Sequence, residues 1–233
     1  MSKRSRVNTE WDYAVLARKY DGNNERLNGS GARTSRRARI LDEGQIAAAL
    51  RRIRETSNSP ESDEVKFLLS VRAGLRAAEI AGLTMADVLN ADGTIGAVIH
   101  VGRHIAKGGK QRMIPLHPQL KQALERLRAA HPDVRHVSFS KRRQPRRQSA
   151  QAVTHWFWRF YAELGLEGCS SHSGRRTFIT NLARLANERD YSLRDVQQLA
   201  GHARLDTTAA YIDPAANLGL LVASLGQPTP RSA

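Results

Sequence analysis

The sequence predicts a mostly α-helical domain with one small antiparallel β-sheet. Apolar residues recur three to four positions apart along most of the chain, as Ile46, Leu50 and Ile53 do, and this is the period of a helix with one buried face. Residues 95–101 instead alternate between apolar and other side chains, which is the period of a strand. The pair Gly108-Gly109 follows and favours a tight turn between two strands. The 233 residues, of which 40% are hydrophobic, suffice for a buried core.

The predicted elements can be placed in order along the chain. Helical spacing occurs in seven segments, at residues 46–53, 65–72, 76–82, 118–127, 153–164, 171–185 and 192–199. Pro118 opens the fourth of these helices. Ser192 and Asp195 form a capping box at the start of the last one. A further short strand is expected at 134–139, and a basic loop at 141–149 follows it.

Positive charge dominates the chain, with 37 Lys and Arg against 22 Asp and Glu, a formal net charge of +15. Such an excess indicates a polyanionic partner, most often nucleic acid. Two runs without acidic residues contain the expected DNA-binding residues, namely Arg103, Lys110 and Arg112 beside Lys107 in the first run, and Arg135, Lys141, Arg142, Arg143, Arg146 and Arg147 in the second. Basic clusters contact phosphates and make the affinity depend on salt. The alternative is a solvated basic surface, which we favour less at this net charge.

Several classes of protein and site do not fit the sequence. The single cysteine, Cys169, rules out a disulfide framework and a cysteine-based zinc cluster. His100 and His104 lie four positions apart in a predicted strand, where that spacing does not form a helical zinc site. We therefore expect neither a metal nor a cofactor. The basic N-terminus lacks the apolar core of a signal peptide, and the apolar stretch from Leu218 to Leu225 is too short to span a membrane, so a cytoplasmic protein is expected.

Six polar residues are candidates for a catalytic site, namely Arg76, Lys107, His172, Arg175, His202 and Tyr211. Each has an ordinary structural explanation when it is considered alone. Arg76 and Glu79 have the spacing of a surface ion pair on a helix, which contributes only about 0.2–0.5 kcal/mol. Tyr211 fits a core tyrosine with a solvated hydroxyl. Only the order and spacing of the whole set indicate a function.

Four segments around these residues occur in a distinctive order. They are AGLRAAEIAGL at 73–83, AKGGKQRMIPL at 106–116, HSGRRTF at 172–178, and VQQLAGH at 196–202 followed by TTAAY at 207–211. Any one of them is a weak signal, but four in register are specific. Together they resemble the catalytic domain of the tyrosine recombinases, also called the phage-integrase family. The resemblance covers residues 40–215 and implies the mostly helical fold of that domain.

The resemblance implies a site-specific DNA recombinase or integrase that breaks and rejoins DNA through a 3′-phosphotyrosine intermediate. The implied roles are a nucleophile, Tyr211; phosphate contacts from Arg76, Arg175, His172 and His202, with His172 also assisting proton transfer; a general acid, Lys107; and an acidic residue that orients the site, Glu79. The residue types suit this chemistry, because a covalent intermediate retains the energy of the cleaved bond. Arginine presents a planar fork of donors to a phosphate, and cationic side chains supply the electrostatics without a metal.

The resemblance also implies partners. They are double-stranded DNA, further copies of the chain in a synaptic tetramer on DNA, and accessory DNA-bending proteins, in the nucleoid of a bacterium that hosts a phage or mobile element. Two alternatives of other classes stay open. One is a non-catalytic DNA-binding regulator with the same fold, although a regulator has no need of Tyr211. The other is an enzyme like the type IB topoisomerases, whose usual clamp domain is not found here.

The sequence departs from the family pattern at three points. Residues 1–39 form a basic N-terminal arm, partly disordered, which is too short for the helical DNA-binding domain that usually precedes a catalytic domain such as 40–215. The chain is either a natural short form or a piece of a longer product, and we expect it to bind DNA mostly through charge. The apolar tail at 216–233 either docks on a neighbouring subunit or packs on its own core. Gly174 replaces the usual leucine, and we expect looser packing there.

Overall fold

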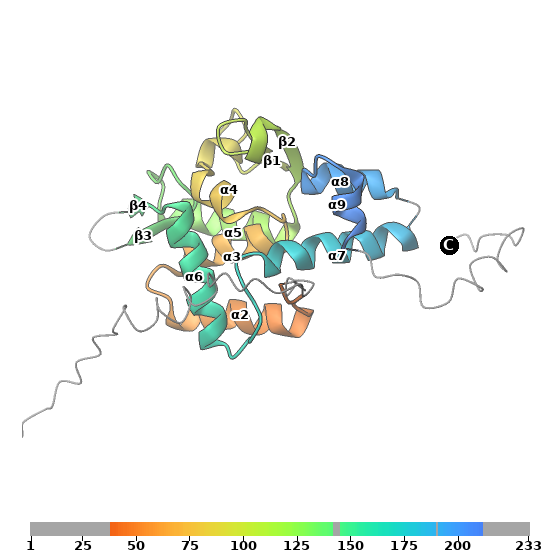
Figure 1. Cartoon of the computed structure of the whole chain (residues 1–233). Coiled ribbons are helices and arrows are strands. Elements are labelled where there is room, and N and C mark those ends of the chain that lie inside the picture. Colours follow the sequence, from red (N-terminus) through yellow and green to blue (C-terminus); the bar gives the residue numbers. More distant parts are fainter. Residues whose placement is uncertain (1–37, 142–144, 190, 212–233) are drawn as a thin grey trace, which may run out of the picture. The chain divides into compact units, whose positions relative to one another are not determined.

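The computed structural model describes residues 38–141, 145–189 and 191–211, which form a mainly helical unit (Figure 1). The helices are α2 (Glu43–Thr56), α3 (Pro60–Val71), α4 (Ala77–Gly82), α5 (Pro118–Ala130), α6 (Ala150–Glu163), α7 (Ser173–Glu188), α8 (Leu193–Ala200) and α9 (Leu205–Ala209). The strands and 3₁₀ turns are η1 (Met85–Asp87), β1 (Val98–Val101), η2 (Lys107–Gly109), β2 (Arg112–Pro115), β3 (Phe139–Lys141) and β4 (Pro145–Arg147). The predicted class, mostly helical with a small amount of antiparallel sheet, is confirmed.

Polar caps define the ends of several helices. The Asp42 carboxylate accepts a hydrogen bond from the Gln45 amide at 2.8 Å, and the Gln45 side chain accepts one from the Asp42 amide at 3.1 Å, so α2 begins with a capping box. The predicted box of Ser192 and Asp195 opens α8 in the same way. That helix ends at Gly201, whose φ of +63° is the left-handed conformation that glycine adopts without strain.

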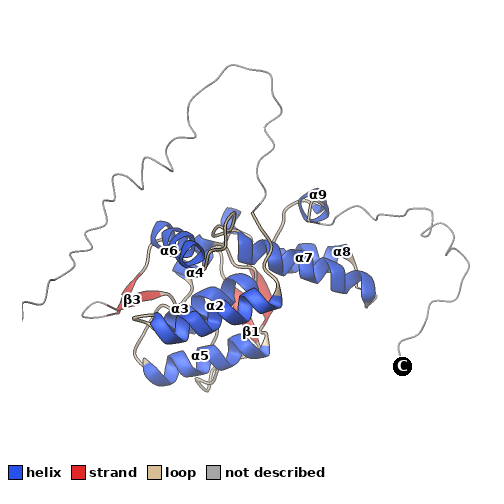
Figure 2. Ribbon diagram, turned by 90° about the horizontal axis from the view of Figure 1, so that it is seen from below, coloured by secondary structure: helices blue, strands red, loops and turns tan. Residues whose placement is uncertain are grey.

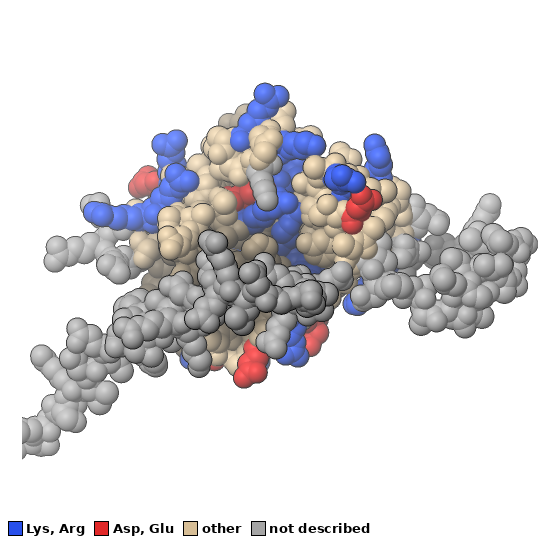
Figure 3. All heavy atoms as spheres, in the orientation of Figure 1, with Lys and Arg blue, Asp and Glu red and all other residues tan. Residues whose placement is uncertain are grey.

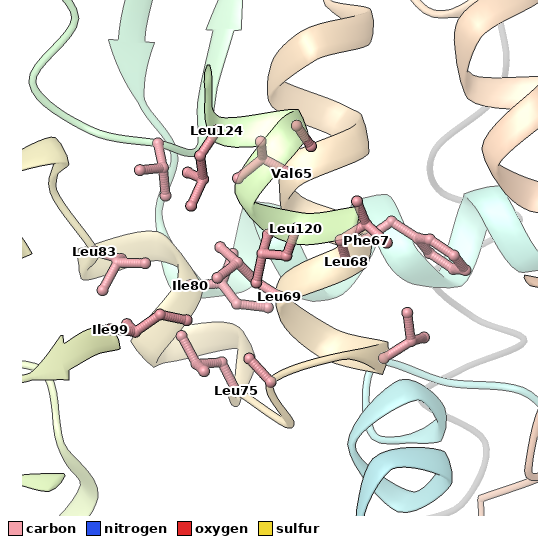
Figure 4. Close-up of a cluster of buried hydrophobic side chains, with 14 of the residues drawn as sticks. Val65, Phe67, Leu68, Leu69, Leu75, Ile80, Leu83, Ile99, Leu120 and Leu124 are labelled. Atoms are coloured by element: carbon pink, nitrogen blue, oxygen red, sulfur yellow. The ribbon is translucent and has the colours of Figure 1, made fainter. Parts of the chain in front are cut away.

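The main core is built around α3, which packs against both α2 and α5 (Figure 2). Val65, Leu68 and Leu69 of α3 have no exposed surface, and they face Leu120 and Leu124 of α5 (Figure 4). A helix that is buried on nearly all sides is typical of the centre of a domain. Each such side chain contributes about 1.5–3 kcal/mol when it is fully buried. We call the cluster of buried residues from Leu41 to Tyr161 the main core.

The strands form two separate hairpins. In the first, β1 and β2 pair antiparallel, with Val98 opposite Pro115 and Val101 opposite Arg112. In the second, β3 and β4 pair antiparallel, with Phe139 opposite Arg147. The small antiparallel sheet of this fold therefore consists of two pieces of two strands each.

The second hairpin differs from the sequence prediction. A strand was expected at 134–139 and a loop at 141–149, whereas the strands lie at Phe139–Lys141 and Pro145–Arg147. Of the expected strand, Phe139 begins β3 and His136 makes an isolated bridge to Thr84. The prediction is wrong because strand pairing depends on a backbone partner, which the side chains of a basic run do not reveal. Basic side chains are nevertheless usual on edge strands such as these.

A second, smaller group of apolar residues lies on the C-terminal helices, and we call it the C-terminal cluster. Its buried members are Ile179, Ala183, Ala186, Val196 and Ala200. Phe178, Leu182 and Tyr211 are partly buried and pack against it. In Figure 1, α8 and α9 lie together beside the C-terminal half of α7. The segment that ends at Tyr211 is thus supported by a cluster of its own.

Gly174, in the first turn of α7, brings two helices closer together. A β-carbon at Gly174 would lie 2.3 Å from Oγ of Ser70 and 3.0 Å from Cγ1 of Val71. No larger residue fits while α7 packs this closely on α3. The expectation of loose packing at Gly174 is therefore wrong, because a neighbouring helix takes the place of the missing side chain.

Some predictions concern residues that the structure does not describe. They are the N-terminal arm up to residue 37, Arg142 and Arg143 in the second basic run, and the tail at 216–233. Within the described part of the chain, no helix has the length and apolar character that crossing a membrane requires.

Candidate active site

Arg76 is held at the N-terminus of the short helix α4. Its backbone N–H donates to Oε2 of Glu79 at 2.9 Å, and its Nη1 donates to Oε1 of the same carboxylate at 3.2 Å. Glu79 is completely buried, whereas a quarter of the Arg76 side chain is exposed. The Arg76 guanidinium is therefore tethered on one side and open to solvent on another.

Arg112 belongs to the same group of ion pairs, which corrects its assignment as a DNA-binding residue. Its Nη1 and Nη2 donate to Oε1 and Oε2 of Glu79, both at 2.9 Å, and its side chain is only 6% exposed. A guanidinium that is buried and bound on both arms does not extend along a DNA backbone. Burial alone raises the pKa of Glu79, but the hydrogen bonds and charges of Arg112 and Arg76 outweigh it and lower that pKa. Glu79 therefore stays a carboxylate.

Arg175 joins the main core to the C-terminal cluster. Its Nη1 donates to the Gly74 carbonyl at 2.5 Å, just before α4, and its Nη2 donates to the Ala200 carbonyl at 2.6 Å, at the end of α8. The residue is 4% exposed. Burial, and then the charges of Arg76 and Arg112, lower the pKa of Arg175 to about 10, so it remains a cation at neutral pH. Both of its hydrogen bonds go to neutral carbonyls, so an anion placed beside it would be stabilised.

His202 and Tyr211 stack on each other next to Arg175. Their ring centroids are 5.6 Å apart and their planes are inclined by 27°. Nδ1 of His202 lies 2.9 Å from Oγ1 of Thr208, a fully buried residue of α9. The backbone N–H of Tyr211 donates to the Thr208 carbonyl at 3.0 Å. Thr208 thus contacts the ring of His202 and the backbone of Tyr211.

The arginines make this part of the surface strongly positive. Burial, followed by the charges of the three arginines, lowers the pKa of His202 to about 4, so His202 is neutral at physiological pH. Figure 3 shows Lys and Arg side chains gathered in the central hollow of this face. Three arginines and one buried carboxylate leave an excess of positive charge, which favours an anionic ligand. Among the described residues, no three His, Cys, Asp or Glu side chains are grouped as metal ligands.

His172 lies at the N-terminal cap of α7, one turn before Arg175. Its backbone N–H donates to Oγ of Ser170 at 3.3 Å, and its Nδ1 lies 3.5 Å from Oγ of Ser171. The residue is exposed, whereas Arg175 is buried. Helix geometry places residues three apart on the same side, so the two predicted residues lie at the same end of α7.

Lys107 begins the turn η2 between β1 and β2. Gly108 and Gly109 adopt φ values of +70° and +69°, and a β-carbon at either would have no neighbour within 4 Å. The turn therefore extends into open space. Just before it, Ile105 packs so closely on Gly82 of α4 that a β-carbon at Gly82 would lie 2.3 Å from its Cγ2. The turn is thus anchored to the helix that carries Glu79.

Five of the other predicted DNA-binding residues lie at the surface. Those with exposed side chains are Arg103, Lys110, Arg135, Arg146 and Arg147. Lys141 ends β3, in the same hairpin. Arg147 also donates from Nε to the Ala81 carbonyl at 3.1 Å, so β4 is attached to α4. The basic hairpin and the site therefore share one helix.

Sequence reasoning missed two supporting residues. Thr208 contacts both His202 and Tyr211, and its only signal in the sequence is its place in the last motif, three residues before the tyrosine. Gly201 leaves little space for a side chain, because its φ is +63° and a β-carbon there would lie 3.0 Å from Cδ of Arg112. A glycine before His202 is visible in the sequence, but the neighbour that requires it is not.

Most of the chain matches the model of a known protein family. The model of the phage integrase family matches residues 39–217. The chain belongs to the phage integrase family. The matched region contains all four motifs, so the predicted resemblance is confirmed.

Two relatives in the phage integrase family illustrate the extent of the similarity. The chain is 31% identical to tyrosine recombinase XerA of Pyrococcus horikoshii over 151 residues, which are 64% of this chain and 49% of XerA. It is also 31% identical to tyrosine recombinase XerD of Yersinia pestis over 185 residues, which are 73% of this chain and 56% of XerD. This phage-integrase chain therefore spans about half the length of these curated relatives.

Solved structures share the fold of this phage-integrase chain. The Tn1549 transposon integrase in complex with transposon right end DNA aligns with a TM-score of 0.62 at 19% identity, covering 79% of this chain and 64% of that one. The XerH site-specific recombinase bound to its difH substrate aligns with a TM-score of 0.60 at 20% identity, covering 81% and 54%. The fold expected from the resemblance is thus confirmed.

Proposed function

We propose that this chain is a site-specific recombinase that breaks and rejoins DNA through a covalent bond between Tyr211 and a 3′ phosphate. The observation that carries the proposal is the stacking of Tyr211 on His202, directly beside a buried group of arginines. A phosphodiester is the anion that DNA offers to such a site. A tyrosine hydroxyl is a nucleophile that can hold a phosphoryl group in a covalent intermediate.

The proposed cleavage step exchanges one phosphate ester for another. The Tyr211 oxygen attacks the phosphorus and forms the new P–O bond, while the bond from phosphorus to the 5′ oxygen breaks. His172 takes up the phenol proton, and Lys107 gives a proton to the departing 5′ oxygen. Attack by a 5′ hydroxyl on the phosphotyrosine reverses every one of these changes. No external source of energy is needed, because the number of ester bonds stays the same.

The arginines supply the electrostatic part of the mechanism. Arg76 and Arg175 donate to the non-bridging oxygens, where negative charge increases in the transition state. The lowered pKa of Arg175 supports this role, because it reflects a buried cation that an anion would stabilise. Thr208 lies at Nδ1 of His202, so Nε2 is the ring nitrogen that contacts the phosphate. The buried carboxylate of Glu79 holds Arg76 in place through hydrogen bonds from its backbone N–H and its Nη1.

Double-stranded DNA is the proposed partner. The Tn1549 integrase and XerH structures contain DNA, and so does that of a lambda integrase dimer on a core site. In this chain, the exposed basic residues of the β1–β2 turn and the β3–β4 hairpin would contact phosphates outside the site. Further copies of the chain would assemble on DNA as a synaptic tetramer, aided by accessory DNA-bending proteins in the nucleoid.

The test is a search for a covalent adduct on DNA. The probe is a pool of duplex oligonucleotides with a nick close to the cleavage position, so that the short fragment bearing the free 5′ hydroxyl diffuses away and the adduct accumulates. We expect the wild-type chain to form an adduct that peptide mapping places on Tyr211. Tyr211→Phe should abolish it while leaving DNA affinity unchanged, since only the hydroxyl is removed. An adduct at another residue would refute the assignment, and DNA binding without any adduct would indicate a non-catalytic regulator.

A further inference from the structure

Arg112 contacts two other elements of the site from its own strand, β2. Its two terminal nitrogens bind both oxygens of Glu79 in α4, at 2.9 Å each. On its other side lies Gly201 at the end of α8, where a β-carbon would approach Cδ to 3.0 Å and both Nε and Nη1 to 3.1 Å. Arg112 therefore lies between the helix that carries Arg76 and the segment that carries His202.

A second buried glutamate in the same chain shows what a merely stabilising group looks like. Glu64 of α3 is 4% exposed and is paired with Arg54 at 2.5 Å and with Arg126 at 3.0 Å. Both arginines bind one oxygen only, and their side chains are 54% and 48% exposed. Arg112 is instead 6% exposed and bound on both arms. Burying an arginine this deeply is unfavourable unless its geometry is well satisfied.

One donor of Arg112 is left over. Its Nε is buried and has no hydrogen-bond partner among the described residues. Buried donors without partners are uncommon, and each one calls for an explanation. Here the unpaired Nε lies beside Gly201, where β2 approaches the end of α8.

We propose that Arg112 is a positioning residue for the reaction at Tyr211, an inference that rests on the proposed function. It holds Glu79, and through Glu79 it orients Arg76 toward the phosphate. Through Gly201 it sets where His202 lies relative to that arginine. Because β2 follows the turn that begins at Lys107, the same contact also secures the C-terminal side of that turn. Arg112 itself touches neither DNA nor the reacting atoms.

The most informative variant is Arg112→Lys. Lysine keeps the positive charge but is a point donor, so it cannot bind both oxygens of Glu79. Small misplacements in a site reduce rates roughly 10²-fold. We expect adduct formation at saturating DNA to slow by roughly 10- to 100-fold, with DNA affinity within about twofold of wild type. The matched control is Arg126→Lys, at the other buried glutamate, which should cleave at the wild-type rate.

A charge-balanced double variant separates positioning from stability. Arg112→Met alone leaves Glu79 buried with one partner fewer, so this variant is expected to be destabilised. Adding Glu79→Gln removes the buried negative charge and should recover much of the thermal stability. Cleavage should stay low in the double variant, because Arg76 still lacks its fixed support. Recovery of stability together with a normal cleavage rate would overturn the proposal.

A measurement without DNA distinguishes this inference from the proposed function. NMR titration of His202 should give a pKa of about 4 in the wild type. In Arg112→Lys it should rise toward the ordinary value, because the segment moves and becomes solvated, and in Arg126→Lys it should not change. If the wild type forms no adduct, the proposed function fails, and an unchanged His202 titration then overturns the inference as well. A loss of DNA affinity as large as the loss of rate would make Arg112 a DNA contact instead, which also overturns it.

Discussion

The main core and the C-terminal cluster support two halves of the same candidate site, and they differ in the size of their buried side chains. Around α3, large side chains such as Phe67 and Leu68 are fully buried. In the C-terminal cluster, three of the five buried members are alanines. Burial stabilises in proportion to apolar area, so the described residues of this cluster contribute much less. Arg76 and Glu79 are attached to the first region, whereas His202 and Tyr211 are attached to the second.

The difference indicates that the half with Arg76 and Glu79 is supported by the larger core, while the half with His202 and Tyr211 depends on its connections to that core. Two arginines make those connections. Arg175 reaches the carbonyls of Gly74 and Ala200, and Arg112 lies between Glu79 and Gly201. Of these two, only Arg175 is assigned to the phosphate in the proposed mechanism. Under the proposed function, a phosphate bound to Arg175 would stabilise the C-terminal cluster by mass action.

The largest expected effect is a gap in local stability between the two regions. Amides of α3 should exchange with deuterium only through global unfolding, at about 5–15 kcal/mol for a domain. Amides of α8 should exchange through a local opening that costs several kcal/mol less, since few large side chains hold that helix. Native-state hydrogen exchange followed by mass spectrometry measures both. Equal protection of α3 and α8 would show that the two helices unfold as one unit. It would contradict the expected difference in local stability.

Truncations in the two regions should sharpen the gap. Leu68→Ala leaves a cavity in the main core and should lower the free energy of global unfolding by about 2–5 kcal/mol. Val196→Ala removes about two methylene equivalents from the C-terminal cluster and should lower the local opening energy of α8 by roughly 1.6 kcal/mol. Denaturant unfolding measures the first effect and hydrogen exchange the second. If Val196→Ala lowers the protection of α3 by the same amount, the two regions do not unfold separately, and the expected difference in stability is wrong.

Arg175→Lys should affect chemistry and connection together. Losing one planar donor at the transition state is expected to slow adduct formation by roughly 10²–10³. Because the contact with the Ala200 carbonyl is also lost, protection of α8 should fall. Arg76→Lys is the matched control, with a similar loss of rate but unchanged protection of α8, since the contacts of Arg76 go to Glu79. Normal cleavage by both variants would make these arginines structural.

The last expected effect is a dependence on pH. The pKa of His202 is about 4 in the folded chain and about 6.5 in an unfolded one. As pH falls from about 6.5 to 4, the unfolded segment takes up a proton that the folded one does not, so the C-terminal cluster loses stability in this window. Bound DNA should raise the pKa of His202, because a phosphate favours the imidazolium. NMR titration with and without DNA measures both shifts, and an ordinary pKa in the free chain would contradict the site geometry.

The elements that the sequence predicts well are those with local causes. The apolar spacing of α3, the proline that opens α5 and the capping box of Ser192 and Asp195 all act within a few residues, so each is visible in a short stretch of sequence. The order of the motifs likewise indicates which residues belong to the site, from Arg76 to Tyr211. Those features required no knowledge of which distant segments meet.

Tertiary structure alone decided how the predicted residues are used. Arg103 and Arg112 belong to one basic run, yet Arg103 is exposed and Arg112 is buried on Glu79, 33 positions away in the chain. Gly174 and β4 show the same principle. The space at Gly174 is filled by α3, and β4 is a strand because it pairs with β3, and neither neighbour is visible in the local sequence. Charge and spacing are properties of the chain, and the sequence determined them. Burial and pairing are properties of two segments in contact, because water and partners compete for every polar group, and only the folded arrangement settles that competition.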